Sequence, residues 1–273
     1  MIGALGADYD KHGEDTMSAL KAIVVAALAI AFSVGGAAAQ SEKWKKIRIG
    51  TEGEYPPFNF IDSNKQIQGF DIDIAKALCE KLKAECTFVA QDWDGIIPAL
   101  VAGKYDAIVA SMSITEERKK RIDFTDKYYH TPAVFVAPTK AGLKDVSPAA
   151  LKGKTLGAQS STIHSGYLED NYKGSTLKFY KSQDEANADL AAGRLDAVLA
   201  DKVALNDWLK KPDAKCCAIA GPDLTYGGGV GIGLRKEDQD LKSQFNKAIK
   251  EILADGTYKK INDKYFTFSI YGP

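Results

Sequence analysis

Residues 100–110 read LVAGKYDAIVA and residues 190–201 read LAAGRLDAVLAD, so one pattern occurs twice at a distance of ninety residues. Each copy is typical of a helix end that is stopped by glycine and followed by an apolar strand. The spacing is too long for a solenoid repeat. We therefore interpret the copies as corresponding units in two similar α/β lobes. The first copy leads into Ser111 and the second ends in Asp201, so the two units carry different chemistry at the same place.

Strand and helix patterns alternate on both sides of this repeat. Apolar strand patterns occur at 47–52, 86–91, 104–110, 153–161, 175–181 and 194–200. Helical patterns occur at 70–84, 94–104, 115–122, 182–194, 201–211 and 240–266. Such alternation predicts parallel βαβ sheets with helices on both faces.

Two further segments have the pattern of crossings between the lobes. Residues 130–140 are apolar and bounded by prolines, and residues 221–238 are rich in glycine. The chain is therefore expected to build lobe 1 from residues 40–130 and 229–273, and lobe 2 from residues 131–228. Two adjacent hinge segments favour closure of the lobes over a ligand.

The N-terminal region has the layout of a secretory signal peptide. The stretch KAIVVAALAIAFSVGGAAAQ (21–40) contains a lysine, an apolar run and small residues that end in an A-x-A motif. We predict that residues 1–39 are a leader and signal peptide, that translation starts at Met17, and that the mature chain is exported. A transmembrane helix is the weaker interpretation, because two glycines interrupt the apolar run.

Export bears on the state of the four cysteines. Cys79 and Cys86 lie seven residues apart, where a helical pattern passes into a strand pattern. An oxidising compartment favours a disulfide bond between them over two buried thiols. Cys216 and Cys217 are adjacent, and because a disulfide between neighbours is strained, we expect free thiols at these two positions.

Charge and histidine content argue against several kinds of partner. The 36 Lys and Arg residues balance 36 Asp and Glu residues, so no net field would recruit nucleic acid. The chain has three histidines, one of them in the leader, which gives little support for a zinc site. We expect neither a metal nor a cofactor.

The chain after the leader resembles the bacterial periplasmic amino-acid-binding proteins of ABC importers, which are solute-binding protein family 3. The resemblance rests on GFDIDIAKALCEKL (69–82), SMSITEER (111–118), AGRLDAVLAD (192–201) and the ending GLRKED…ADGTYKKINDKYF. It is especially similar to lysine/arginine/ornithine-, histidine- and opine-binding members. The resemblance implies an α/β, two-lobed periplasmic-binding-protein fold with two hinge crossings. It also implies a monomer in the periplasm that takes a small amino acid and delivers it to an ABC permease in the membrane.

The two repeat copies are expected to end at one cleft, because ligands bind beyond the carboxyl ends of strands in open α/β sheets. Arg118 is placed there to bind an α-carboxylate, since a guanidinium matches a carboxylate bidentately. Ser111 and Ser113 would lie beside it. The alternative for Arg118 is an exposed arginine in the basic run 118–121, and the resemblance favours the ligand role.

The second lobe is expected to contribute an acid and a helix start. Asp201 would bind the α-ammonium group of the ligand, although it would also suit the cap of helix 201–211. Ser161 and Thr162 lie where a strand pattern enters a helix, and the free N–H groups of a helix start bind anions. Simple capping of that helix is the alternative for these two residues.

Glu52, Tyr55 and Trp93 are expected to bind the ligand's side chain. Glu52 ends the first strand pattern, and in the proteins that the chain resembles an acidic residue here faces a distal cation. Tyr55 and Trp93 match aromatic walls between which an aliphatic stem and a guanidinium stack. The alternatives are a surface glutamate and two core aromatics. Ala110 and Ile163 stand where related proteins often carry polar residues, which leaves the ligand's identity open.

The expected function is capture of a cationic L-amino acid, namely arginine, lysine, ornithine or histidine, by hinge closure. Two alternatives stay open. One is an opine binder, and the other is a periplasmic dehydratase on the same fold, with Glu52 as a general acid. Against an enzyme, the sequence contains no nucleophile–base pair, metal cluster or cofactor motif.

Overall fold

The computed structural model describes residues 43–272, and every element below belongs to the unit that begins at Lys46. The predicted signal peptide at 1–39 and the predicted start at Met17 lie outside the described residues. Within residues 43–272, the helices are all too short or too polar to cross a membrane.

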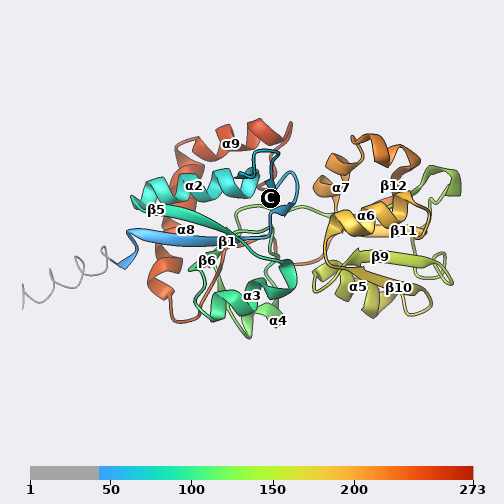
Figure 1. Ribbon diagram of the computed structural model, residues 1–273, viewed down its shortest axis with the longest axis horizontal. Helices are drawn as coiled ribbons and strands as arrows, with labels where there is room; N and C mark the ends of the chain where they lie inside the picture. Colours follow the sequence, from blue (N-terminus) through green and yellow to red (C-terminus); the bar gives the residue numbers. More distant parts are fainter. Residues whose placement is uncertain (1–42, 273) are drawn as a thin grey trace, which may run out of the picture. The chain divides into compact units, whose positions relative to one another are not determined.

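Two five-stranded sheets form the centres of two lobes (Figure 1). The first sheet has the order β5 (Glu85–Ala90), β1 (Lys46–Thr51), β6 (Ala107–Ile108), β13 (Gly233–Leu234) and β7 (Asp123–Phe124). The second has the order β10 (Thr176–Tyr180), β9 (Thr155–Gln159), β11 (Ala197–Asp201), β8 (Ala133–Pro138) and β12 (Cys217–Leu224). A small sheet of β2 (Glu54–Tyr55), β3 (Asn59–Ile61) and β4 (Ile67–Gln68) follows β1. Three strands are parallel in each large sheet, as the alternating pattern predicts.

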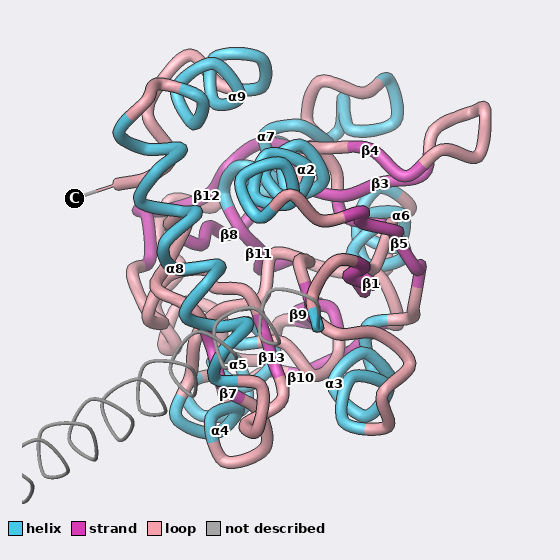
Figure 2. The backbone as a smooth tube through the Cα atoms, turned by 90° about the vertical axis from the view of Figure 1, so that its left-hand side faces the viewer, coloured by secondary structure: helices cyan, strands magenta, loops and turns pink. Residues whose placement is uncertain are grey.

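Helices pack on both faces of the sheets. The first lobe has α2 (Phe70–Leu82), α3 (Trp93–Val101), α4 (Glu116–Lys119), α8 (Gln239–Ala254) and α9 (Thr257–Tyr265). The second lobe has α5 (Ile163–Asn171), α6 (Gln183–Ala191) and α7 (Lys202–Trp208), with 3-10 turns at Thr139–Ala141 and Pro212–Cys216. Figures 1 and 2 show α2 on one side of β1 and β5 and α3 on the other.

The prediction of one long helix over 240–266 is wrong. The segment forms two helices, α8 and α9, which meet at Gly256. The φ angle of Gly256 is +81°, a left-handed value that ends a helix and that glycine adopts without strain. The chain thereby turns once more before its C-terminal residues.

The repeat occupies the centre of each sheet. β6 and β11 are the middle strands, and α3 and α6 precede them. Gly103 and Gly193 follow those helices with φ angles of +75° and +74°. One helix-stop-strand unit in each lobe is therefore confirmed.

The least similar pair of the repeat, Tyr105 and Leu195, packs in the same way in both lobes. A Cβ on Gly50 of β1 would lie 2.5 Å from the ring of Tyr105. A Cβ on Gly157 of β9 would lie 2.4 Å from Cδ1 of Leu195. Each large side chain thus fills the space over a glycine in the neighbouring strand, and a larger residue at either glycine would displace it.

The aspartate that both copies share fastens the neighbouring strand. Asp106 accepts a hydrogen bond of 2.9 Å from the backbone N–H of Arg48 in β1. Asp196 accepts one of 2.8 Å from the backbone N–H of Thr155 in β9. The same residue therefore holds the first parallel strand against the repeat in each lobe.

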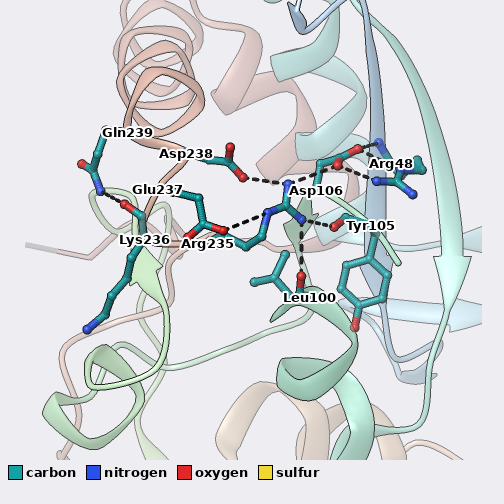
Figure 3. A network of polar contacts seen from close by, with 9 residues as sticks. All are labelled: Arg48, Leu100, Tyr105, Asp106, Arg235, Lys236, Glu237, Asp238 and Gln239. Carbon is teal, nitrogen blue, oxygen red and sulfur yellow. Dashed lines mark hydrogen bonds and ion pairs between the residues drawn. The ribbon is translucent and has the colours of Figure 1, made fainter. Parts of the chain in front are cut away.

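In the first lobe this aspartate also belongs to a network of charges (Figure 3). Nη2 of Arg48 and Nη2 of Arg235 lie 2.8 Å and 3.3 Å from Oδ1 of Asp106. Arg235 also donates to the backbone carbonyls of Tyr105 at 2.6 Å and Leu100 at 3.3 Å. Burial alone would raise the pKa of Asp106, but the hydrogen bonds from the two arginines hold it below its ordinary value. The GLRKED stretch thus binds the returning chain to the first repeat copy.

The predicted crossings are shorter than expected. Most of 130–140 forms β8, and the first part of 221–238 continues β12. The reason is that Val134, Phe135 and Val136 are fully buried in the second sheet. Where the chain passes between the sheets, Tyr129 pairs with Val230 in an isolated antiparallel bridge, so the two crossings run side by side.

Both pairs of cysteines form disulfides. The bond between Cys79 and Cys86 is confirmed, with Cα atoms 6.2 Å apart, and it joins α2 to β5. The expectation of free thiols at Cys216 and Cys217 is wrong, because these neighbours are also bonded. Cys216 ends a 3-10 helix and Cys217 begins β12. The chain changes conformation between them, so their side chains need not point to opposite sides as in a continuous strand.

Asp71 of the GFDID motif supports a loop instead of capping α2. Gly69 occupies the N-cap, and Asp71 is fully buried. Its carboxylate accepts hydrogen bonds from Asn59 Nδ2 at 2.9 Å and from the Tyr128 hydroxyl at 2.7 Å. The backbone N–H of Ser111 also donates to it. This buried acid therefore fixes the loop that carries Ser111.

Candidate functional site

A cavity lies where the strands of both lobes end. It is lined by Glu52, Tyr55, Trp93, Ala110, Ser111, Ser113, Arg118, Gln159, Thr162, Ile163, His164 and Asp201. Eight of the nine residues predicted for the site are among these, and Ser161 reaches the same side chains through its carbonyl group. The structure therefore brings the predicted residues together, as expected where the carboxyl ends of strands converge.

Arg118 extends from the first turn of α4. Thr115 caps this short helix by accepting a hydrogen bond from the backbone N–H of Arg118. Nη1 of Arg118 donates to the carbonyl of Ser113 at 2.8 Å, and Nη2 donates to the carbonyl of Ser161 at 3.3 Å. The guanidinium carbon is 5.2 Å from the centre of the Trp93 ring, within cation–π range.

The Arg118 guanidinium keeps its charge although it is desolvated. Burial lowers the pKa of Arg118 to about 10, and the charge of Asp201 opposes this effect. A guanidinium has five N–H donors, and the two carbonyl contacts leave others for a carboxylate. The cavity thus offers a fixed positive group.

Two serines of the site have left-handed backbone conformations. The φ angles are +53° at Ser111 and +55° at Ser161. Such angles are strained for residues other than glycine and persist where surrounding contacts hold them. Ser111 Oγ is hydrogen-bonded to the hydroxyl of the buried Tyr129. The contact with Tyr129 therefore helps to hold the loop that carries Ser111 in this conformation.

Thr162 caps α5 and also lies on the wall of the cavity. Its hydroxyl accepts from the backbone N–H of Ser165, and with Ser165 it forms a capping box at the start of α5. The same residue lines the cavity. The carbonyl of Ser161 accepts from Trp93 Nε1 at 3.1 Å. This contact joins the first lobe to the second at the edge of the site.

Asp201 occupies the N-cap position of α7, but its side chain makes no capping hydrogen bond. Oδ2 accepts a hydrogen bond of 2.7 Å from the Tyr55 hydroxyl and lies 3.4 Å from Nε2 of His164. The capping alternative is therefore wrong. The carboxylate faces the cavity, as an ammonium-binding group must.

Glu52 is a buried acid, with 7% of its surface exposed, and not the surface glutamate of the alternative interpretation. Gln159 Nε2 donates a hydrogen bond to its carboxyl group. Burial raises the pKa of Glu52 to about 7, and the charges of Glu54, Asp184 and Asp92 add to the rise. A cationic group in the cavity would stabilise the ionised form.

The aromatic residues of the site are packed and still reach the cavity. Tyr55 and Trp93 are 6% and 8% exposed, so they are core residues as well as wall residues. The Tyr55 ring stacks on Phe58 with centroids 5.9 Å apart. The core interpretation is therefore confirmed for these two side chains, which also form part of the cavity wall.

Two residues of the cavity were missed by sequence reasoning. Gln159 ends β9 as Asp201 ends β11, so its position at a strand end was a usable signal. His164 was considered only as a zinc ligand. Across residues 43–272, His, Cys, Asp and Glu side chains nowhere gather in a group of three that could hold a metal ion.

A cavity between two α/β lobes, with a guanidinium and two carboxylates on its walls, suits a small charged molecule. The fold and the site thus define the class of two-lobed proteins that enclose small ligands. Residues 47–268 match the bacterial extracellular solute-binding proteins, family 3, and the chain belongs to this family.

Three relatives illustrate the range of the family. The L-arginine-binding protein of Pseudomonas aeruginosa is 50% identical over 235 residues, which cover 84% of this chain and 90% of that protein. A periplasmic His/Glu/Gln/Arg/opine family-binding protein from Silicibacter pomeroyi, solved in complex with lysine, is 37% identical with a TM-score of 0.75, over 82% of this chain and 98% of its own. An ancestral amino-acid-binding protein, a precursor of cyclohexadienyl dehydratase, is 32% identical with a TM-score of 0.75, over 82% of this chain and 96% of its own.

Proposed function

We propose that this protein is the periplasmic solute-binding component of an ABC importer and that it encloses a cationic L-amino acid, arginine before the others. The observation that carries the proposal is the burial of Glu52 in the same cavity as Arg118 and Asp201. One guanidinium and two carboxylates complement a ligand with one carboxylate and two cationic groups. The relative that binds L-arginine supports this choice.

The proposed roles follow from the chemistry of each wall. Arg118 binds the α-carboxylate, with Ser111, Ser113, Ser161 and Thr162 adding hydroxyl and backbone groups. Asp201 binds the α-ammonium group. Glu52 pairs with the distal cation, and Tyr55 and Trp93 flank the aliphatic stem between the two ends.

The acidic residues around Glu52 favour a ligand with a cationic side chain over one with a neutral side chain. Glu54, Asp92 and Asp184 act on Glu52 with the same sign of charge, so the ionised carboxyl lacks local compensation. A neutral ligand would leave that carboxyl buried without a counter-ion, whereas a guanidinium or ammonium group would pair with it. The same argument covers lysine, ornithine, protonated histidine and the larger opines derived from arginine.

Closure of the lobes is part of the proposal. Residues 40–130 and 229–273 would move as one body, and residues 131–228 as the other, about the crossings near Tyr129 and Val230. Contacts between these bodies include Trp93 with Ser161 at 3.1 Å and Ser160 Oγ with Asp94 at 2.9 Å. They must break when the cavity opens and form again over the ligand.

Location and partners complete the proposal. The chain would be exported by a signal peptide at 1–39, act as a monomer in the periplasm, and deliver its ligand to an ABC permease in the membrane. It would need no cofactor and no nucleic acid. The names of the relatives, which are binding proteins, support binding over catalysis.

The experiment is a thermal-shift panel followed by calorimetry on the mature chain. L-Arginine, lysine, ornithine, histidine, glutamine and octopine are added singly, because a ligand of the folded state raises its apparent stability. We expect the largest shift with arginine and a much smaller one with glutamine. A shift with none of the cationic ligands would overturn the proposal, and a larger shift with octopine would replace arginine by an opine.

A second function is favoured by one observation. A carboxyl with a pKa of about 7 suits a general acid, and one relative is a precursor of a dehydratase. In this alternative Glu52 would protonate the leaving hydroxyl of a cyclic substrate. Turnover of arogenate or prephenate by the purified chain, abolished by Glu52→Gln, would support the enzyme. Stable arginine binding without turnover would support the binder.

A further inference from the structure

His164 lies in the first turn of α5 and is almost fully buried, with 4% of its surface exposed. Its ring is one of the walls of the cavity. Nε2 lies 3.4 Å from Oδ2 of Asp201, and Nδ1 lies 2.7 Å from the hydroxyl of Tyr226. The imidazole therefore links the proposed ammonium-binding acid to a tyrosine on the second crossing.

One tautomer of the His164 ring suits both contacts. When the tyrosine hydroxyl donates to Nδ1, the neutral imidazole carries its proton on Nε2, which then points at the carboxylate. Tyr226 is itself held, because its ring stacks on Tyr167 with centroids 4.4 Å apart and planes within 6°. The position of the imidazole is thus defined by aromatic packing in the second lobe.

Both contacts of the Asp201 carboxylate fall on one oxygen. Tyr55 from the first lobe and His164 from the second lobe both approach Oδ2. The contact with His164 lies within the second lobe and does not depend on closure, so it restricts the rotation of the carboxylate before the bond from Tyr55 forms. Oδ1 would then remain for the ligand. An acceptor that is already oriented binds an ammonium group more tightly, because less ordering is needed at binding.

We propose that His164 is a positioning residue that orients Asp201. It thereby determines how strongly the site prefers ligands with an α-ammonium group over ligands without one. The inference rests on the proposed function, since it assumes that Asp201 receives that group. It assigns to His164 no contact with the ligand's side chain. Loss of the imidazole should therefore lower the affinity for all α-amino acids by a similar factor. The affinity for a ligand that lacks the ammonium group should stay nearly the same.

The test compares L-arginine with 5-guanidinopentanoic acid, which is arginine without its α-amino group. Affinities of the mature chain are measured by calorimetry, with displacement of arginine for the weaker ligand. We expect His164→Ala to lower the affinity for arginine about tenfold and the affinity for the analogue less than about twofold. His164→Gln, whose amide nitrogen can reach the place of Nε2, should restore most of the loss.

A second pair of variants distinguishes the contact of Tyr226 with His164 from general damage to the fold. Tyr226→Phe removes the hydroxyl on Nδ1 and keeps the stacked ring, and it should weaken arginine about threefold and selectively. Tyr167→Phe removes a hydroxyl from the same aromatic pair without touching His164, and it should leave both affinities unchanged.

Three outcomes decide the matter. Equal losses for arginine and the analogue in His164→Ala, or no loss for either, would overturn the inference while the proposed function stands. A loss confined to arginine and restored by His164→Gln would establish it. Failure of the parent chain to bind arginine, lysine, ornithine or histidine would overturn the proposed function and this inference together.

Discussion

The hydroxyl of Tyr55 lies 2.7 Å from Oδ2 of Asp201, a residue 146 positions further along the chain. Tyr55 belongs to β2, beside the first sheet, and Asp201 ends β11 in the second sheet. The bond therefore spans the cavity and joins the two lobes. It takes the carboxylate away from the helix start that the local sequence would let it cap.

Tyr55→Phe should weaken L-arginine binding about tenfold, because the closed form loses a hydrogen bond to a charged acceptor. The ring and its stacking on Phe58 remain, so the fold of the lobe is kept. Tyr265→Phe is the matched control, since it removes a 2.7 Å hydrogen bond to Asp73 at a distance from the cavity wall. Calorimetry that finds equal losses in the two variants would contradict the role given to Tyr55.

Glu52→Gln should lower the affinities for arginine and lysine by at least about thirtyfold and the affinity for glutamine far less. The reason is that the amide keeps the shape of the side chain but removes the charge that pairs with a distal cation, which typically costs about 2–5 kcal/mol. Glu54→Gln, an exposed acid two residues away, should change the arginine affinity less than about threefold. Titrations of all three ligands against each variant test this selectivity, and a uniform loss would count against it.

The ligand-free protein should close less readily as the pH rises. In an open form Glu52 is solvated and titrates near its ordinary value of 4.5, whereas closure buries it and raises its pKa to about 7. The closed form therefore holds the proton more tightly. Glu52 therefore favours closure fully below pH 4.5, and this contribution to the free energy of closure is lost as the pH rises to about 7. The contribution is about 3 kcal/mol at most.

Small-angle scattering of the ligand-free chain measures this change. The radius of gyration should be larger at pH 8 than at pH 4.5, and Glu52→Gln should remove the difference. A pH-dependent radius that persists in Glu52→Gln would assign the effect to another group.

Much of this site could be predicted because strand ends converge in a parallel sheet. Glu52, Ser111 and Asp201 each follow or end a strand, so recognition of β1, β6 and β11 is sufficient to bring them together. Gln159 obeys the same rule at the end of β9. The repeat predicted the two lobes, and the alternation of strand and helix patterns predicted the parallel sheets.

The remaining features depend on packing that no local pattern encodes. His164 reaches Tyr226 across 62 residues, and Asp71 reaches Tyr128 across 57. Asp201 also suited a helix cap by sequence, and Asp71 lies in the first turn of α2, but in both cases a tyrosine from a distant segment binds the carboxylate. Cys216 and Cys217 form their bond because a 3-10 helix ends between them, a boundary that the composition of the segment does not mark.

Arg118→Lys should reduce the arginine affinity at least about a hundredfold. A lysine has a point charge on a flexible stem and cannot reproduce the two carbonyl contacts, the approach to Trp93 and a bidentate carboxylate at once. Arg121→Lys, in the same basic run but exposed, is the control and should bind as the parent does. An affinity of Arg118→Lys within tenfold of the parent would show that this guanidinium does not bind the carboxylate.

The repeated aspartates offer a test of stability that is independent of the ligand. Asp106 has 10% of its side chain exposed and Asp196 has 43%, although each binds the backbone N–H of a neighbouring strand. Asp106→Asn removes the carboxylate that Arg48 and Arg235 share and leaves Arg235 with Asp238 at 2.7 Å as its nearest acid, so it should lower the free energy of unfolding by about 3 kcal/mol. Asp196→Asn keeps a hydrogen-bond acceptor near solvent and should cost about 1 kcal/mol. Urea denaturation of both variants measures the difference. Equal losses would mean that the backbone hydrogen bond common to the two lobes, and not the arginine network of the first, determines the stability at this position.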